Sequence, residues 1–396
     1  MSLWRKWDLI SINIYIYIYL FEGVIIYYLG DYIYIREVIL LLILISYYKN
    51  IIKFGKMGKY DIYWISILLF YFLVGLFFTE NIKQVILGSK LFILMYIGYI
   101  LYKKYFNNIN FLKKYYIGFF LLSCLGIFLQ YFYNDLPWSS VQRTWTIYTA
   151  GISDSTDNLF RLAGFGRLSN SVASMIVCSF VWIICFCNRK WIYSIIGLIA
   201  VILTTSRGGI VAYIICMCIY FFKGHKGEEF LLKTFFYVGI ISLIGLPIYA
   251  IVFDGGNVVY LKDDVFVFLL ATIQDRMVNS WNGTFLIVKD YGSMLLGRGF
   301  GGIGSVRELY DKFVSYQNPI DNFFVMLYGN IGILVFIVFF AIIKKIIKLD
   351  FSKIEEKYIY IFFIMLFYAG IVNDMMEPMI LIHLGYCMGY LLYNIK

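Results

Sequence analysis

The stretch that decides the fold is Ile12-Asn-Ile-Tyr-Ile-Tyr-Ile-Tyr19. Its strict alternation is typical of a β-strand. The stretch belongs, however, to an apolar run at residues 9–29 that is long enough to cross a bilayer. In lipid a lone strand leaves its backbone N–H and C=O groups without partners, whereas a helix bonds them internally. We therefore expect a helix here, in an all-α membrane protein.

The rest of the chain is similarly apolar. Of its 396 residues, 62% are hydrophobic and 15% are charged, whereas a soluble domain is about half apolar and a quarter charged. The apolar runs predict a polytopic protein with about twelve transmembrane helices, although 191–222 also fits a single re-entrant hairpin. These runs lie near 9–29, 33–48, 61–78, 83–102, 115–133, 168–187, 191–205, 208–222, 231–253, 322–343, 358–373 and 378–393.

The lysines predict the orientation of the chain in the membrane. They cluster in short connections at alternate ends of the runs, which marks these connections as cytoplasmic and explains the net charge of +10 without nucleic acid. We expect a protein of the cytoplasmic membrane with both termini in the cytoplasm. The first run is too long for a cleavable signal peptide and lacks a small-residue cleavage site. The clusters are Lys49, Lys53, Lys56 and Lys59; Lys103, Lys104, Lys113 and Lys114; and Lys344, Lys345, Lys348, Lys353 and Lys357.

Two predicted outer segments are longer than ordinary connections. They cover residues 134–166 and 254–321, and the second precedes the tenth run. Because long connections without a role are uncommon, we expect the second to form a small extracytoplasmic cap. The sequence otherwise indicates a single transmembrane domain over residues 1–396.

The sequence offers no metal or cofactor site. All seven cysteines lie in apolar runs, where core packing explains them. His225 lies in a cytoplasmic lysine-rich loop and His383 in the last run. Metal-ligand spacing and a nucleotide-binding loop are both lacking, which disfavours a transferase that uses a metal-bound nucleotide sugar.

Arginine is distributed against the usual bias. Eight of the ten arginines are predicted to lie outside, although basic residues usually gather inside. A guanidinium binds phosphate or carboxylate through two parallel hydrogen bonds, which lysine cannot do. The pattern therefore predicts an anion-binding outer surface, although long loops also collect arginines by chance. The eight are Arg36, Arg143, Arg161, Arg167, Arg207, Arg276, Arg298 and Arg307.

Two short segments are candidates for chemistry. Arg207 follows an apolar run, and the next residues, Gly208 and Gly209, would let the backbone turn and a ligand approach. A snorkelling arginine at a helix end is the alternative. Asp321 precedes the tenth run, where a carboxylate serves either as a helix cap or as a general base.

Several segments between residues 160 and 340 resemble the O-antigen ligase/polymerase superfamily. Ser206-Arg-Gly-Gly209 looks like its SRG signature. Arg161-Leu-Ala-Gly-Phe165, followed by Asn170 and Ala173, resembles its R-x-x-G-x-F…N-x-x-A segment. Asp275-Arg276, then Trp281 and Leu296-Gly-Arg-Gly299, resembles DR…W…LG-x-G. Asp321-Asn322, nine residues and Gly332 resemble the ligase motif H-N-x9-G-x-x-G, with Asp321 in place of histidine and Val335 in the last position.

This resemblance implies a Wzy-type polysaccharide polymerase, because the histidine of the ligases is missing. Its substrates would be oligosaccharide repeat units on a polyprenyl diphosphate, and its partners a chain-length regulator and a flippase. On this view Arg207 and Arg276 act on the diphosphate with support from Arg161 and Arg298. Asp321 takes the acceptor proton, Asn322 orients the sugar, and Gly208 allows close approach.

Three alternatives remain open at this point. A ligase would move a finished glycan onto a lipid or protein, and a flippase would move the lipid-linked unit across the membrane. A transporter usually carries charge at mid-membrane, whereas here only Glu22 is a candidate for such a charge. A structural scaffold would leave the arginines unexplained.

Overall fold

A computed structural model describes residues 3–30, 34–54, 58–105, 109–133, 136–139, 161–187, 190–252, 276–304, 321–372 and 375–395. The regular structure in these ranges is helical, as expected. The chain forms two compact units. Unit 1 comprises residues 1–59, 104–223 and 377–380, and unit 2 comprises 60–103, 224–376 and 381–396. Most of both predicted outer segments, including most of the expected cap, lies outside the described residues.

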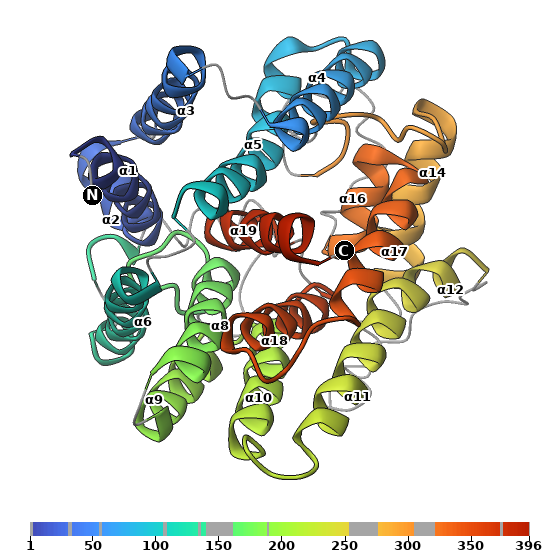
Figure 1. The fold of residues 1–396 in the computed structure, drawn as a ribbon. Coiled ribbons are helices and arrows are strands. Elements are labelled where there is room, and N and C mark those ends of the chain that lie inside the picture. Colours follow the sequence, from blue (N-terminus) through green and yellow to red (C-terminus); the bar gives the residue numbers. More distant parts are fainter. Residues whose placement is uncertain are drawn as a thin grey trace. The chain divides into compact units, whose positions relative to one another are not determined.

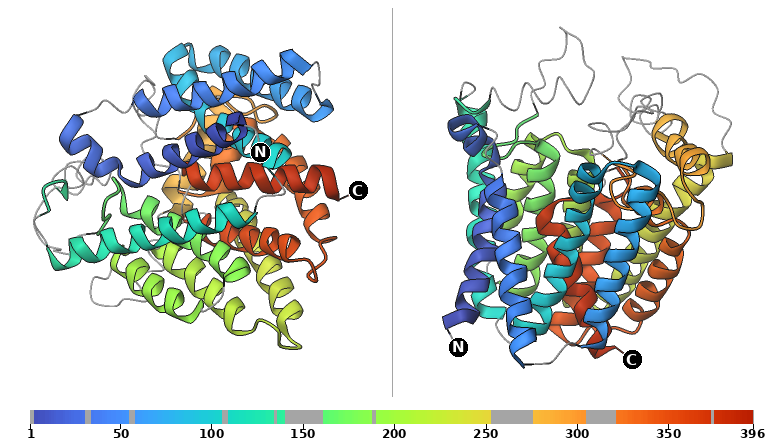
Figure 2. Two further views of the ribbon diagram at one scale, coloured as in Figure 1. Left: turned by 60° about the vertical axis from the view of Figure 1, so that its left-hand side comes forward. Right: turned by 90° about the horizontal axis from the view of Figure 1, so that it is seen from above.

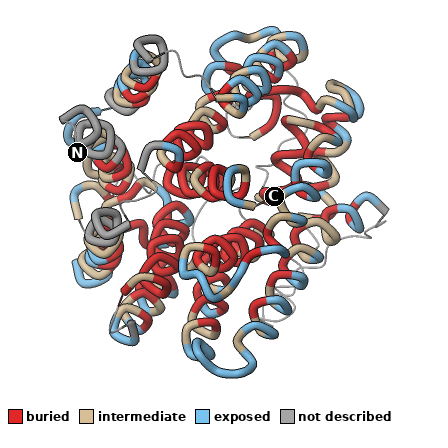
Figure 3. The backbone as a smooth tube through the Cα atoms, in the orientation of Figure 1, coloured by how far each residue is buried: buried red, intermediate tan, exposed pale blue. Residues whose placement is uncertain are grey.

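Unit 1 is built around one largely buried helix. That helix, α8, packs against α6, α9 and α10, while α1 packs against α3 (Figures 1 and 2). Its buried residues run from Ser169 to Cys185 (Figure 3). The alternating stretch at residues 12–19 lies in α1, so the prediction of a helix there is confirmed. The helices are α1 (Leu3–Leu20), α2 (Glu22–Leu29), α3 (Tyr34–Phe54), α6 (Ile109–Phe132), α8 (Ser169–Phe186), α9 (Lys190–Leu203) and α10 (Arg207–Phe221).

The connection between α9 and α10 is tight, but its turn differs from the expected one. The residue with positive φ is Thr205, at 55°. Gly208 is buried inside the first turn of α10, and a Cβ at Gly209 would come within 2.9 Å of the Ala173 Cβ on α8. The prediction that Gly208 makes the turn is therefore wrong. Gly209 instead lets α10 approach α8 closely.

Unit 2 contains the remaining helices. Its α11, η1 and α12 follow one another without a break, η1 being a π-helical turn, and α11 packs on α18. The elements are α4 (Lys59–Thr79), α5 (Ile82–Tyr105), α11 (Glu228–Ile240), η1 (Ile241–Gly245), α12 (Leu246–Val252), the π-helix η2 (Arg276–Trp281), α14 (Asn282–Tyr291), α16 (Phe323–Ile331), α17 (Leu334–Ile346), α18 (Ile354–Ala369) and α19 (Pro378–Asn394).

Four stretches of helix are long and apolar enough to cross a membrane. They are Lys59–Thr79, Ile82–Lys103, Ser169–Phe186 and Glu228–Ile251. Only 17% of the first is buried, and Leu69, Leu73 and Phe77 on it are 58%, 56% and 77% exposed. Continuous exposed apolar surface of this kind requires a nonaqueous environment. The four stretches therefore indicate a multi-pass membrane protein.

A glycine-rich segment, residues 292–304, packs against α4, α5 and α16 and is called the glycine loop below. Its backbone is held by Arg298 N–H, which donates to Gly329 O at 2.9 Å, and by Phe300 N–H, which donates to Tyr71 O at 3.2 Å. Gly299 has a φ of +72°, and a Cβ there would lie 2.1 Å from Gly75 N. Only glycine fits such a conformation at such a distance.

The tenth predicted run is two helices, because it breaks at Gly332. This residue has a φ of +64°, and a Cβ there would lie 2.4 Å from Leu295 O. The break between α16 and α17 thus receives the start of the glycine loop. The loop in turn connects directly to α14, which packs on both η2 and α16. This arrangement fixes η2 close to the start of α16.

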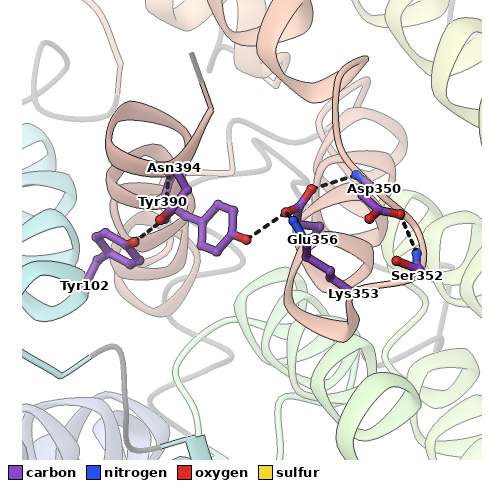
Figure 4. Close-up of polar contacts among 7 residues, drawn as sticks. All are labelled: Tyr102, Asp350, Ser352, Lys353, Glu356, Tyr390 and Asn394. Carbon is purple, nitrogen blue, oxygen red and sulfur yellow. Dashed lines mark hydrogen bonds and ion pairs between the residues drawn. The ribbon is translucent and has the colours of Figure 1, made fainter.

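A buried carboxylate ties α18 to α19. Glu356 is 2% exposed and accepts hydrogen bonds from the Tyr390 hydroxyl at 3.0 Å, Lys353 Nζ at 2.9 Å and Asp350 N–H at 2.6 Å (Figure 4). A buried charge is tolerated when it is paired and hydrogen-bonded. All three donors are groups of the protein itself. Glu356 therefore has a structural role, which is to hold α18 and α19 together.

Two glycines let α5 and α19 touch backbone to backbone within unit 2. A Cβ at Gly385 would lie 1.8 Å from Met95 O, and one at Gly98 would lie 1.9 Å from Ile382 O. We predict that Gly385→Ala lowers the free energy of unfolding by about 1–3 kcal/mol, because a rigid backbone cannot yield to the added methyl group. Thermal unfolding in detergent measures this. Gly227→Ala, with nothing within 4 Å, is the control, and equal melting temperatures for the two variants would contradict the prediction.

Candidate active site

Asp321 lies at the centre of a polar cluster in unit 2. The Arg276 guanidinium donates from Nε to Asp321 Oδ2 as an ion pair. The Trp281 indole N–H donates to Asp321 Oδ1 at 3.2 Å, and the Ser280 hydroxyl approaches the same oxygen at 3.5 Å. The Arg276 and Asp321 side chains are 22% and 25% exposed. The carboxylate is thus held from one side and remains accessible.

The π-helix η2 explains why three of its residues reach one carboxylate. In a π-turn each backbone N–H bonds five residues back, so Trp281 lies above Arg276. Trp281 is fully buried, which anchors this turn to the interior of unit 2. Because π-turns are less stable than α-turns and often occur at functional sites, η2 supports a specific role for these side chains.

Asn322, the next residue, is the helix cap. Its Oδ1 accepts the Val325 N–H at 3.0 Å, and its Nδ2 donates to Ile371 O at 3.1 Å and to Leu243 O at 3.4 Å. The side chain is fully buried. Asn322 is therefore engaged in the framework, which gives no support to its expected contact with a sugar. The capping alternative for Asp321 also falls, since the cap position belongs to its neighbour.

The environment of Asp321 contains influences that oppose its ionisation and others that favour it. Burial raises the pKa of Asp321 above the usual range of an aspartate, while Arg276 and the Trp281 N–H act in the opposite direction. An ionised carboxylate has about four acceptor positions. The three side-chain donors above and the backbone N–H of Asp321 itself all interact with this carboxylate. The cluster thus joins a carboxylate, which can take up a proton, to a guanidinium, which can pair with an anion.

Arg298 lies in the same unit but is not part of this cluster. It is 1% exposed, and its Nη1 donates to Gly302 O at 2.9 Å within the glycine loop. A Cβ at Gly302 would lie 2.3 Å from the Arg298 Cβ, so the loop closes tightly around this side chain. The position gives no support to the predicted contact between Arg298 and substrate. It indicates that Arg298 holds the shape of the loop.

The other predicted residues belong to unit 1. Arg207 is the first residue of α10 and is half-buried, behind a Thr205 whose backbone is left-handed. Arg161 is exposed at the start of the segment that leads into α8. The structure therefore brings Arg276 and Asp321 together, and it places Arg161 and Arg207 in the other unit.

Unit 1 also holds a polar cluster that was not assigned from the sequence. Glu22 of α2 is 7% exposed and pairs with Arg167 at 3.4 Å. Glu377, just before α19, accepts hydrogen bonds from the hydroxyls of Tyr19 and Ser171. Glu22 was recognised as a charge within a run, but Arg167 resembles an ordinary loop charge. Only their contact across 145 positions reveals the pair.

Comparisons with protein-family models, with curated proteins and with solved structures found no match. Within the described ranges, no group of three or more His, Cys, Asp or Glu side chains could hold a metal ion. The features that bear on function are therefore the geometry of the Asp321 cluster and the sequence segments that it contains.

The assignment of the cap gives a prediction about two adjacent residues. Asn322→Ala removes the cap of α16 and should lower the free energy of unfolding by about 1–2 kcal/mol. Asn322→Asp retains an acceptor oxygen for the Val325 N–H and should lose less. Asp321→Asn should leave stability nearly unchanged. Thermal unfolding in detergent tests all three, and a larger loss in Asp321→Asn than in Asn322→Ala would show that the roles are reversed.

Proposed function

We propose that this protein polymerises oligosaccharide repeat units carried on a polyprenyl diphosphate, at the outer face of the cytoplasmic membrane. The observation that carries the proposal is the contact between Arg276 and Asp321, with Trp281 beside them. These residues come from segments that resemble the O-antigen ligase/polymerase superfamily, and they are separated by 45 positions. A topology of about twelve spans with both termini in the cytoplasm is part of the same proposal.

The reaction is a glycosyl transfer. A hydroxyl oxygen of the acceptor glycan attacks the anomeric carbon of the donor, and the bond from that carbon to the diphosphate oxygen breaks. The bonding electrons leave with the diphosphate, and the hydroxyl proton passes to the Asp321 carboxylate. The products are a lengthened lipid-linked glycan and a free polyprenyl diphosphate. Since the glycosyl phosphate bond already stores the energy, the step requires no nucleotide.

The arginines stabilise the leaving group. Negative charge grows on the diphosphate as the bond breaks, so a fixed guanidinium binds the transition state more strongly than the ground state. Arg276 donates to Asp321 through Nε, and its five N–H groups allow it to contact a phosphate as well. For Arg207 and Arg161, which belong to unit 1, a role at the diphosphate is proposed from the sequence resemblance alone. Arg298 and Asn322 maintain the framework around this centre.

A ligase and a flippase are distinguished from a polymerase by their products. A cell without a ligase would retain polymer on the polyprenyl carrier, and a cell without a flippase would retain single units on the cytoplasmic side. A cell without this protein should instead hold single units at the outer face. Profiling lipid-linked glycans in a deletion strain separates the three outcomes.

Replacement of the arginine forks should abolish polymer. We predict that Arg207→Lys and Arg276→Lys each reduce chain elongation by roughly 100-fold or more, because lysine retains the charge but loses the paired donors. Single repeat units should accumulate on the lipid. Arg189→Lys, on the predicted cytoplasmic side, is the control. Normal glycan ladders in both Arg207→Lys and Arg276→Lys would refute the diphosphate role.

The proton acceptor should be visible in the pH dependence of the rate. Asp321 must be ionised to act as a base, so activity should fall as the pH drops through its pKa. Since burial raises that pKa, the fall should begin at a higher pH than for an exposed aspartate. Arg276 lowers the pKa, so Arg276→Gln should move the acid limb of its residual activity further upward. Asp321→Asn should be inactive at every pH. Full activity in Asp321→Asn would exclude the base role.

A further inference from the structure

A buried glutamine holds the segment that carries Arg161. Gln130 of α6 is 6% exposed, and its side-chain Oε1 accepts the N–H of Ala163 at 2.9 Å and the N–H of Gly164 at 2.7 Å. One carbonyl oxygen therefore fixes two consecutive backbone groups. These groups lie two and three residues after Arg161. We call this contact the Gln130 clamp.

The same segment is held from two other directions. The Trp138 indole N–H donates to Gly164 O at 2.9 Å, and its ring lies 5.9 Å from that of Phe165. Phe165 O accepts the N–H of Gly23 at 3.1 Å, and its ring packs on Phe21 at 5.0 Å. Donors from three separate elements thus satisfy the backbone of residues 163–165, which leaves this non-helical stretch little freedom.

Close packing reinforces the clamp. Gly164 has a φ of +58°, and a Cβ there would lie 2.7 Å from the backbone of Gly126 on α6. A Cβ at Gly126 would in turn lie 2.7 Å from the ring of Phe165. The segment therefore lies directly on the α6 backbone. A loop so constrained fixes the direction in which the chain leaves it.

The two arginines of this segment differ in their contacts and exposure. Arg167, at its end, pairs with Glu22. Arg161, at its beginning, is exposed, and in the described part of the chain no hydrogen bond or ion pair engages its guanidinium. A backbone held by several donors beside an exposed cation is typical of a preorganised binding group. Preorganisation lowers the entropy lost when a ligand is bound.

We propose that Gln130 is a positioning residue for Arg161, and that the clamp holds this guanidinium where it binds the diphosphate of a lipid-linked substrate. The proposal rests on the proposed function for the identity of the anion. It assigns Gln130 a task that acts entirely through Arg161. It also makes Trp138 a secondary support, because its N–H holds Gly164 from the opposite side.

The test uses full-length protein in detergent and two matched replacements. Gln130→Met has nearly the same shape but lacks the acceptor oxygen, whereas Gln130→Glu retains an acceptor. Ser123→Ala is the control, since Ser123 lies on the same helix, is 1% exposed and donates only to Phe119 O of its own helix. Trp138→Phe weakens the clamp by a different route and serves if Gln130→Met fails to accumulate in membranes.

Two quantities are measured for each variant. One is the Kd for polyprenyl diphosphate without glycan, and the other is the rate of elongation against concentration of the lipid-linked unit. Arg161→Ala should raise Kd and KM by roughly tenfold, the value of one charge-assisted contact. Gln130→Met should raise both by several-fold with a smaller change in kcat. Gln130→Glu should recover most of the affinity that Gln130→Met loses, and Ser123→Ala should have the Kd and KM of the wild type.

The double variant decides whether Gln130 acts through Arg161. If it does, Gln130→Met should add little once Arg161→Ala is present, because residues that act as one unit are not additive. Full additivity, or an unchanged Kd in both Gln130→Met and Trp138→Phe, would overturn the proposal. If wild-type protein binds the diphosphate with this dependence but does not elongate the glycan, the proposed function fails and the clamp stands.

Discussion

The architecture depends on one constraint, which is that backbone polar groups in an apolar environment must find partners within the chain. Most of the described residues meet it by forming helices. The non-helical segments among them meet this constraint in other ways. The glycine loop satisfies its N–H groups with carbonyls of α4 and α16, and the segment before α8 satisfies its own with Gln130, Trp138 and Gly23. In these two described segments, side chains and neighbouring helices thus support the non-helical backbone.

The same constraint explains why the Asp321 cluster is well defined. Residues 292–304 occupy the break at Gly332, and this contact sets α14 against α16. The π-helix that begins with Arg276 continues directly into α14. The contacts of residues 292–304 with α16 therefore help to bring the guanidinium of Arg276 to the carboxylate of Asp321. The cluster pairs a carboxylate with a guanidinium, and the proposed glycosyl transfer uses the first as proton acceptor and the second as partner of the diphosphate.

Hydropathy predicted a helix for each apolar run, since a run of this length has few other structures open to it. It missed the break at Gly332, because a glycine within an apolar run carries no signal of the loop that fills the gap. Motif resemblance selected Arg276 and Asp321 as candidates, and the structure shows that they form an ion pair, a contact that could not be read from two segments so far apart in the sequence. It also grouped Arg298 with them, although burial in the glycine loop gives this residue a different task. Gln130 carries no sequence signal, because one polar residue in a span is as easily a packing residue as a clamp.

The shortness of α9 and α10 has a consequence for the surrounding membrane. With 14 and 15 residues, these helices extend about 21 and 23 Å at 1.5 Å per residue, whereas the hydrocarbon core is about 30 Å thick. If they span the bilayer, lipids beside them must compress, and if they enter as a hairpin, its tip stops within the hydrocarbon. In both cases we expect the tip that bears Arg207 to lie below the ordinary level of the lipid headgroups. A lipid with a doubly charged headgroup would be drawn down at this point, where the bilayer is thinnest and the dielectric screening weakest.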